Sequence, residues 1–114
     1  AKRISNDFEQ LNTVIGIVAT NAPLNRLQLK RMSIMCHGSI SRSIHPSHTP
    51  MDGDTIFAIS TSDESFCVSK EISTLDLTKI STIASDTFSR ACNRAIFEAK
   101  NIGGKPSWKD LFEN

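Results

Sequence analysis

Two short segments of the chain carry apolar side chains at both odd and even positions. Residues 13–20 read TVIGIVAT, whose valines would point to one side of a strand and whose isoleucines would point to the other. Residues 55–60 read TIFAIS and have the same two-sided apolar character. Such runs, bounded by turn residues, are typical of strands covered on both faces. We therefore predict two buried strands, and Gly16 in the first would let another group approach the backbone closely.

Two longer segments instead repeat apolar residues at helical spacing. In the first, Pro23 suits the opening turn and the cap would fall just before it, which predicts a helix over residues 24–43. The second would begin near residues 73–76 and end at the glycines within residues 101–104. Its apolar stripe contains small residues, which indicates close packing against a flat sheet. The stripe is formed by Leu77, Ile80, Ala84, Phe88, Ala91, Ala95 and Ala99.

Two strands and two helices predict a layered α/β fold, and a length of 114 residues suits a single domain. A lone pair of strands with two free edges is not a complete sheet. Further strands would have to come from residues 65–68, from another copy of the chain or from another polypeptide. The polar residues 1–11 would form a lead-in, and residues 106–114 would form a tail suited to docking.

The composition of the chain argues against several classes of partner. Thirteen Lys and Arg against twelve Asp and Glu give a net charge of +1, which argues against nucleic acid because each neutralised phosphate needs its own cation. Aromatic residues make up 6%, too few for a base-stacking surface. No apolar run approaches the ~20 residues of a membrane span, and the first residues lack a signal peptide. Three widely spaced cysteines argue against a disulfide framework, so we expect a cytoplasmic protein.

The junction between the lead-in and the first strand carries a candidate nucleophile, Thr13, preceded by Asn12. A Thr hydroxyl becomes nucleophilic when a base takes its proton, and a free amine on the same residue, with a pKa of about 7.7–8, can do so. Exposing that amine requires cleavage of the bond between Asn12 and Thr13. Taken alone, however, the dipeptide is most simply interpreted as the start of a strand.

A pair of acids, Asp52 and Asp54, flanks Gly53 directly before the second strand. Side chains two residues apart in an extended segment project to the same side, so both carboxylates can address one site. Such a pair can hold an ammonium group, orient a hydroxyl or bind a hard metal ion. The simpler interpretation is an Asp-Gly turn with solvated acids.

A metal site could be sought among His37, His45 and His48 together with Cys36. The segment from His45 to His48 contains a proline that gives it the wrong rigidity for paired ligands, and the sequence has no CxxC motif. We therefore predict no metal site and interpret the histidines as loop or surface residues. The cysteines are interpreted as small core residues.

Taken in order, these features resemble one known family. NTVIGIVATNAPLNRLQLKRM followed by HPSHTPMDGDTIFAIST resembles the L-aminopeptidase/D-esterase family, which includes β-aminopeptidases and nylon-oligomer hydrolases. The resemblance is strong over residues 12–60 and extends over residues 73–100 in pattern only. It implies an α/β/β/α sandwich similar to that of N-terminal-nucleophile hydrolases, made as a precursor that cuts itself before a Ser or Thr.

The resemblance also implies roles for individual residues. Asn12 would be left behind at the cut, and Thr13 would be the nucleophile. Asp52 and Asp54 match the positions that hold and orient it, and two Asp there resemble the nylon hydrolases rather than the β-aminopeptidases, which use a Ser and a Glu. Because two acids favour the protonated amine, the proton acceptor is either that amine or one of the acids, and the sequence leaves both open.

The cut would divide the chain into residues 1–12, which end the large-subunit side, and residues 13–114, the small-subunit region. The implied partners are the upstream large subunit, a short peptide or amide substrate and further copies of the chain, with no cofactor. In the family the oxyanion-stabilising Asn lies in the large subunit, and losing such a donor typically costs ~10²–10³ in rate. We therefore expect these residues alone to be nearly inert.

Two other kinds of function stay open. A non-catalytic α/β fragment would associate by pairing its exposed strand edges with itself or with a host protein. A small-molecule-binding domain with the family fold but without catalysis would keep the architecture and lose the reaction. Cleavage before Thr13 distinguishes the enzyme from the non-catalytic fragment.

Overall fold

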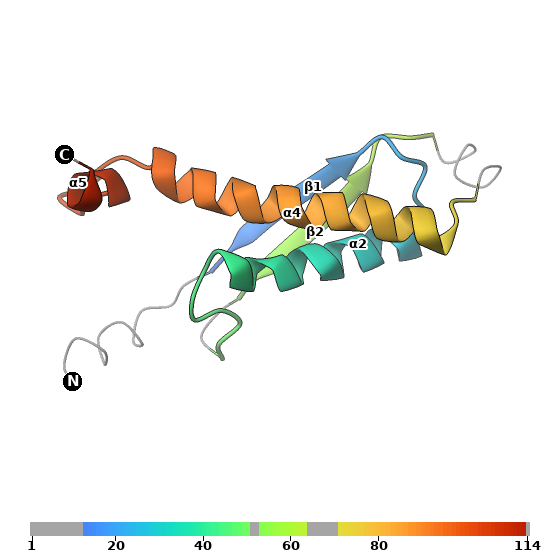
Figure 1. Ribbon diagram of the computed structural model, residues 1–114, viewed down its shortest axis with the longest axis horizontal. Coiled ribbons are helices and arrows are strands. Elements are labelled where there is room, and N and C mark those ends of the chain that lie inside the picture. Colours follow the sequence, from blue (N-terminus) through green and yellow to red (C-terminus); the bar gives the residue numbers. More distant parts are fainter. Residues whose placement is uncertain (1–12, 51–52, 64–70, 114) are drawn as a thin grey trace.

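The computed structural model describes residues 13–50, 53–63 and 71–113 of the chain. Two strands and several helices alternate along it, so the predicted α/β class is confirmed. The elements are β1 (Ile15–Thr20), α2 (Arg26–Ser39), the short 3-10 helix η1 (Ile40–Arg42), β2 (Thr55–Ser60), α4 (Thr74–Glu98) and α5 (Trp108–Phe112) (Figure 1). The predicted lead-in over residues 1–11 and the possible strand over residues 65–68 lie outside the described residues.

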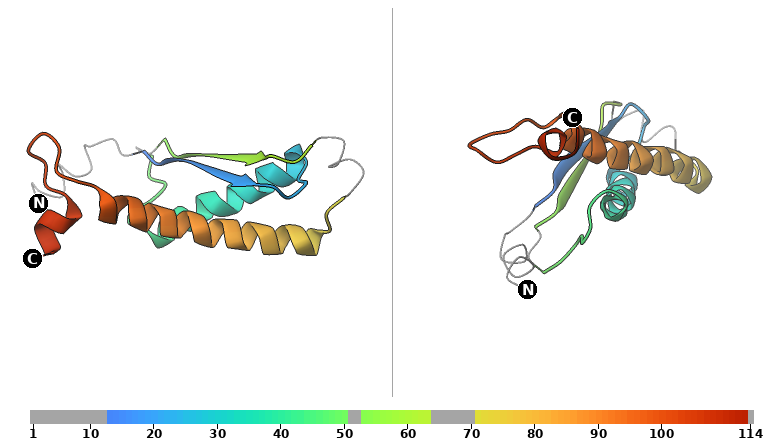
Figure 2. Two further views of the ribbon diagram at one scale, coloured as in Figure 1. Left: turned by 90° about the horizontal axis from the view of Figure 1, so that it is seen from above. Right: turned by 60° about the vertical axis from the view of Figure 1, so that its left-hand side comes forward.

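The strands β1 and β2 form a parallel pair in which Ile15 lies opposite Thr55 and Thr20 lies opposite Ser60. Parallel neighbours need a crossover connection, and α2 provides it. Both α2 and α4 lie on one face of the pair (Figure 2). Alternate strand residues, among them Val18 and Ile56, point to these helices and pack against the core.

The other face of the two strands is open within the described part of the chain. Its apolar side chains are those of Ile15, Ile17, Phe57 and Ile59, which are 73%, 61%, 57% and 43% exposed. The prediction that both faces are covered is therefore met on one face only among the described residues. The apolar character of the second face is the reason that the pattern resembled a doubly covered strand.

The core lies between the sheet and the two long helices, and it is centred on Leu24, Met32, Cys36, Ile40 and Phe88. The ring of Phe88 packs directly on Gly16 in the middle of β1. A Cβ on Gly16 would overlap ring atoms Cε2 and Cζ of Phe88. The predicted close approach at this glycine is confirmed, and the approaching group is an aromatic ring from α4.

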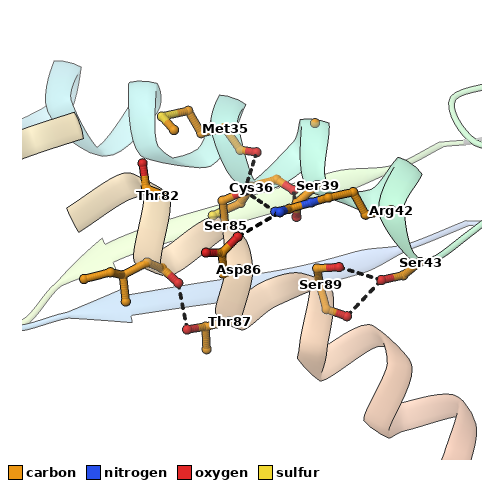
Figure 3. Close-up of polar contacts among 12 residues, drawn as sticks. Met35, Cys36, Ser39, Arg42, Ser43, Thr82, Ser85, Asp86, Thr87 and Ser89 are labelled. Atoms are coloured by element: carbon orange, nitrogen blue, oxygen red, sulfur yellow. Dashed lines mark hydrogen bonds and ion pairs between the residues drawn. The ribbon is translucent and has the colours of Figure 1, made fainter. Parts of the chain in front are cut away.

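Polar contacts join the end of α2 and η1 to the middle of α4 (Figure 3). Arg42 donates from Nη1 to Asp86 Oδ1 and from Nη2 to Ser85 Oγ, each over 2.8 Å. Ser43 Oγ donates to the carbonyl of Ser89 over 2.9 Å and lies 2.8 Å from Ser89 Oγ. Ser85 and Ser89 are both buried, so α4 faces α2 with small polar side chains. This contact was not predicted, because the apolar stripe of α4 lies on a neighbouring face.

The start of α2 corrects the sequence prediction. The helix is capped by Asn25 and not by a residue before Pro23. Asn25 Oδ1 accepts the N–H of Gln28, and Gln28 Oε1 accepts the N–H of Asn25, each over 2.9 Å. This capping box satisfies two backbone donors at once, an advantage that proline at the first turn does not offer. At the other end, η1 extends the helical path close to the predicted end at residue 43.

The second helix begins as predicted, with Ser73 as its cap. It ends at Glu98, before the glycines, and Gly103 and Gly104 adopt the left-handed conformation in the turn that follows. Part of the predicted tail forms α5, where Trp108 packs on Phe97 with ring centroids 5.7 Å apart. Among the described helices, none is both long and apolar enough to cross a membrane.

Candidate functional site

The predicted nucleophile and one predicted acid lie side by side at the start of the sheet. Thr13 and Asp54 come just before β1 and β2, and parallel strands in register begin at the same edge. Asp54 Oδ1 accepts the N–H of Val14 over 2.9 Å, and Val14 in turn accepts the N–H of Thr55 through its carbonyl, also over 2.9 Å. The carboxylate of Asp54 is therefore fixed on the peptide bond that follows Thr13.

The hydroxyl of Thr13 lies next to Gly53. A Cβ on Gly53 would be 3.6 Å from Thr13 Oγ1, which is ordinary van der Waals contact. Thr13 is exposed, so its hydroxyl is open to a reacting group. The other two predicted site residues, Asn12 and Asp52, lie outside the described residues.

Two histidines complete the surroundings of Asp54. His48 Nδ1 lies 3.0 Å from Asp54 Oδ2, and the Asp54 side chain is only 5% exposed. His48 Nε2 lies 3.0 Å from the carbonyl oxygen of His37. The His37 ring stacks on the His48 ring with centroids 4.3 Å apart, and its Nε2 lies 3.3 Å from the Asp54 carbonyl oxygen.

The interpretation of these histidines as loop or surface residues holds for His48, an exposed loop residue, and is wrong for His37, which lies half-buried on α2. Both nevertheless contact Asp54. The position of His48 before the Asp52-Gly53-Asp54 motif was a usable signal, since the intervening segment is short. His37 lies in the last turn of α2, and its contact with the loop arises only when the helix packs under the sheet. No local sequence pattern indicates such a contact.

His37, His48 and Asp54 offer ligand atoms that lie within 4.8 Å of one another, a spacing compatible with a metal ion. The planes of the two rings are only 13° apart and the rings are stacked, so their in-plane nitrogen lone pairs lie in nearly parallel planes and are poorly placed to meet at one ion. The arrangement favours hydrogen bonding within the cluster over coordination. Cys36 is buried in the core and His45 is exposed, and neither belongs to the group.

The described thiols are placed as the sequence predicted. Cys36 is fully buried in the core and Cys92 is half-buried beside it, whereas Cys67 lies outside the described residues. Burial raises the pKa of both the Cys36 and the Cys92 thiol above the ordinary value of 9.0, because a buried thiolate loses hydration. Such thiols are poor nucleophiles at neutral pH.

This burial predicts a loss of stability at alkaline pH. The folded state holds these protons more tightly than the unfolded state, so the stabilisation is complete below pH 9.0 and is lost as the pH rises through the folded pKa values. We expect the free energy of unfolding, measured with urea, to fall as the pH rises above 9.0. The chain has no Tyr to titrate in this range. A variant with Cys36→Ala and Cys92→Ala should show a shallower fall, and an unchanged slope would contradict the assignment.

Comparison with known proteins identifies the family to which the chain is related. The model of Peptidase family S58 matches residues 1–108. An uncharacterized aminopeptidase of Mycobacterium tuberculosis is 32% identical over 107 residues, which cover 89% of this chain and 31% of the relative. A second uncharacterized aminopeptidase, from Mycobacterium leprae, is 30% identical over 118 residues, covering 96% of this chain and 32% of that protein.

A third relative has a more specific name. The 6-aminohexanoate-oligomer endohydrolase of Agromyces sp. is 36% identical over 63 residues, which cover 55% of this chain and 18% of that enzyme. No solved structure matches the chain. The chain thus spans about a third of the length of the aminopeptidases that it matches. The family resemblance inferred from the motifs is confirmed, and the chain belongs to peptidase family S58.

Proposed function

We propose that this chain is the nucleophile-bearing part of a self-cleaving amidohydrolase in which Thr13 attacks amide or ester bonds of short peptides or related compounds. One observation carries the proposal: the buried Asp54 carboxylate is hydrogen-bonded to the backbone directly after an exposed Thr13. An anion fixed at this point restrains the Thr13 backbone, and this restraint limits the orientations that the Thr13 hydroxyl can adopt.

The first step would be cleavage between Asn12 and Thr13. The Thr13 hydroxyl attacks the Asn12 carbonyl carbon, the peptide C–N bond breaks, and an ester links the two residues. Water then hydrolyses the ester, which leaves a carboxyl group on Asn12 and a free amine on Thr13. The same hydroxyl can afterwards attack a substrate carbonyl, which breaks the amide C–N or ester C–O bond, releases the amine or alcohol and leaves an acyl-enzyme. Water then hydrolyses the acyl-enzyme to the free acid and restores the hydroxyl.

Proton transfer in both steps needs an acceptor near Thr13. A carboxylate of Asp52 or Asp54 is a candidate in both steps, whereas the amine of Thr13 is a candidate only in substrate hydrolysis, because it is freed by the cleavage. Asp54 already accepts hydrogen bonds at both carboxylate oxygens, from Val14 and His48. We therefore assign Asp54 to holding and orienting the nucleophile, Asp52 to accepting the proton during self-cleavage, and Asp52 or the freed amine to accepting it during substrate hydrolysis.

The relatives suggest the substrate class and the missing partner. Those named aminopeptidases favour release of N-terminal residues, and the one named 6-aminohexanoate-oligomer endohydrolase favours amides of ω-amino acids. The rest of a longer polypeptide would cover the open face of β1 and β2 with strands of its own and complete the α/β/β/α sandwich. The exposed Ile15, Ile17, Phe57 and Ile59 support this arrangement, because such apolar patches are normally covered.

The proposal is tested by expressing the full-length polypeptide and measuring intact mass and N-terminal sequence. We expect two chains, one of which begins at Thr13, together with hydrolysis of short peptide amides. If the bond before Thr13 stays intact and no amide is cleaved, the alternative of an associating, non-catalytic fragment is favoured. Its exposed sheet face would then bind another chain without chemistry.

A further inference from the structure

We infer that His48 is a positioning residue that clamps the Asp54 carboxylate as a doubly protonated imidazolium, with the neutral His37 ring as its support. The inference rests on the proposed function, in which Asp54 orients Thr13. It gives His37 and His48 a role that the proposed attack by Thr13 does not by itself require.

The hydrogen bonds of Asp54 show why a clamp is needed. Its Oδ1 accepts the Val14 N–H over 2.9 Å, and its Oδ2 lies 3.0 Å from His48 Nδ1. With both oxygens engaged, the carboxylate plane is fixed. The side chain is 5% exposed, so water has little room to replace a lost partner. Without His48, one oxygen of a buried anion would lose its donor, and the carboxylate would be free to turn.

The contacts of His48 indicate its protonation state. Nδ1 faces a carboxylate oxygen, and Nε2 faces the carbonyl oxygen of His37 over 3.0 Å. Both partners are acceptors. A neutral imidazole carries one N–H and satisfies one of them, whereas an imidazolium donates to both. The charged ring also forms the stronger, charge-assisted hydrogen bond with Asp54.

His37 supports this ring from α2. The two imidazoles stack at 4.3 Å, and a second positive charge at that distance would be repelled. The Nε2 of His37 lies 3.3 Å from the Asp54 carbonyl oxygen, which requires an N–H at Nε2 and leaves Nδ1 free of a proton in the neutral ring. The carbonyl of His37 holds one end of His48, and its ring covers the face of His48.

The backbone at His48 supports a dedicated role for the side chain. His48 has a φ of 55°, and it is the one residue other than glycine with positive φ in the described parts of the chain. An L-residue in this region is sterically strained, because its Cβ approaches the following carbonyl oxygen. The loop nevertheless adopts this strained conformation, and in it the His48 ring points to Asp54.

Two isosteric substitutions separate the contacts of His48. In His48→Asn the side-chain amide nitrogen can take the place of Nδ1, so a neutral donor to Asp54 is kept and the contact with His37 is lost. In His48→Gln the amide nitrogen can take the place of Nε2, so the contact with His37 is kept and the donor to Asp54 is lost. Asn also tolerates positive φ, whereas Gln carries the same backbone strain as His.

Both variants are made in the full-length polypeptide, and kcat and KM are measured with a short peptide amide. We expect His48→Gln to lower kcat by about 10- to 100-fold with little change in KM, because a misdirected catalytic group costs rate and not binding. His48→Asn should restore most of that loss. Equal kcat values for His48→Gln and the parent, or equal losses in both variants, would overturn the clamp.

A readout independent of activity keeps this inference separate from the proposed function. Nitrogen-15 NMR of labelled histidines in the same protein should show both ring nitrogens of His48 protonated at neutral pH, with His37 protonated at Nε2 alone. Asp54→Asn should remove the second proton of His48, because the anion that favours it is gone. A neutral His48 in the parent would overturn the clamp even if Thr13 proves to be the nucleophile. Conversely, an inert Thr13 would leave the NMR result standing.

Discussion

Replacing Thr13 with alanine in the full-length polypeptide is expected to abolish both cleavage before residue 13 and hydrolysis of short peptide amides. The alanine variant keeps the backbone that donates to Asp54 through Val14 and loses the hydroxyl together with the adjoining methyl group. Removing the nucleophile of a hydrolase typically lowers kcat by roughly 10³-fold or more, since the remaining groups supply binding and polarisation but no covalent step. Intact mass reports the cleavage, and a peptide-amide assay reports the turnover.

The matched control is Thr13→Ser, which keeps a hydroxyl and, after cleavage, a free amine on the same residue. We expect it to be cut and to retain measurable hydrolysis, slower than the parent because the missing methyl group leaves the hydroxyl less restrained. Thr13 is exposed, so neither variant should change the melting temperature by more than a few degrees. Normal hydrolysis by a folded Thr13→Ala variant would place the nucleophile elsewhere.

The strands were predictable because their signal is local. The two apolar runs within residues 13–20 and 55–60 form β1 and β2, and the two-residue period of a strand places the valines and the isoleucines of the first run on opposite faces, as predicted. The pattern did not show what covers each face. The apolar residues of the open face, such as Ile15 and Phe57, look the same in sequence whether their cover lies in this chain or in another polypeptide.

The start of α2 shows how two valid local signals compete. Pro23 is well suited to an opening turn, but Asn25 and Gln28 form a reciprocal pair of hydrogen bonds that proline cannot match. The spacing of Asn and Gln was present in the sequence. Weighing the number of backbone donors that each alternative satisfies would have favoured Asn25.

The candidate site was predictable in part. Thr13 and Asp54 were proposed from the motif, and their proximity follows from two parallel strands that begin at one edge. The contact between His48 and Asp54 depends on a loop with positive φ and on the packing of α2, which brings His37 under the loop. Such tertiary contacts are not encoded in the spacing of residues along one element.

Replacing Gly16 with alanine is expected to destabilise the fold strongly. The added methyl group would occupy the position of the Phe88 ring, so the ring or the strand would have to leave its packed position. Overpacking of this kind costs about 1–3 kcal/mol, and the strand preference of alanine over glycine recovers only a fraction of it. Urea unfolding of the full-length protein measures the change in free energy of unfolding.

Two further variants identify the cause. Gly38 lies in α2, and a Cβ added to it would have no atom from another part of the protein within 4 Å. Gly38→Ala should therefore leave the stability of the protein unchanged or raise it by about 0.5–1 kcal/mol. Adding Phe88→Leu to Gly16→Ala should cost less than the sum of the two single changes, because the smaller side chain makes space for the methyl group. Strict additivity, or a Gly16→Ala variant as stable as the parent, would show that the ring and the strand are not in contact.

Thr13 lies directly before β1, so a displaced strand should reduce cleavage before Thr13 together with the stability of the protein. Gly38→Ala should leave both the cleavage and the stability intact.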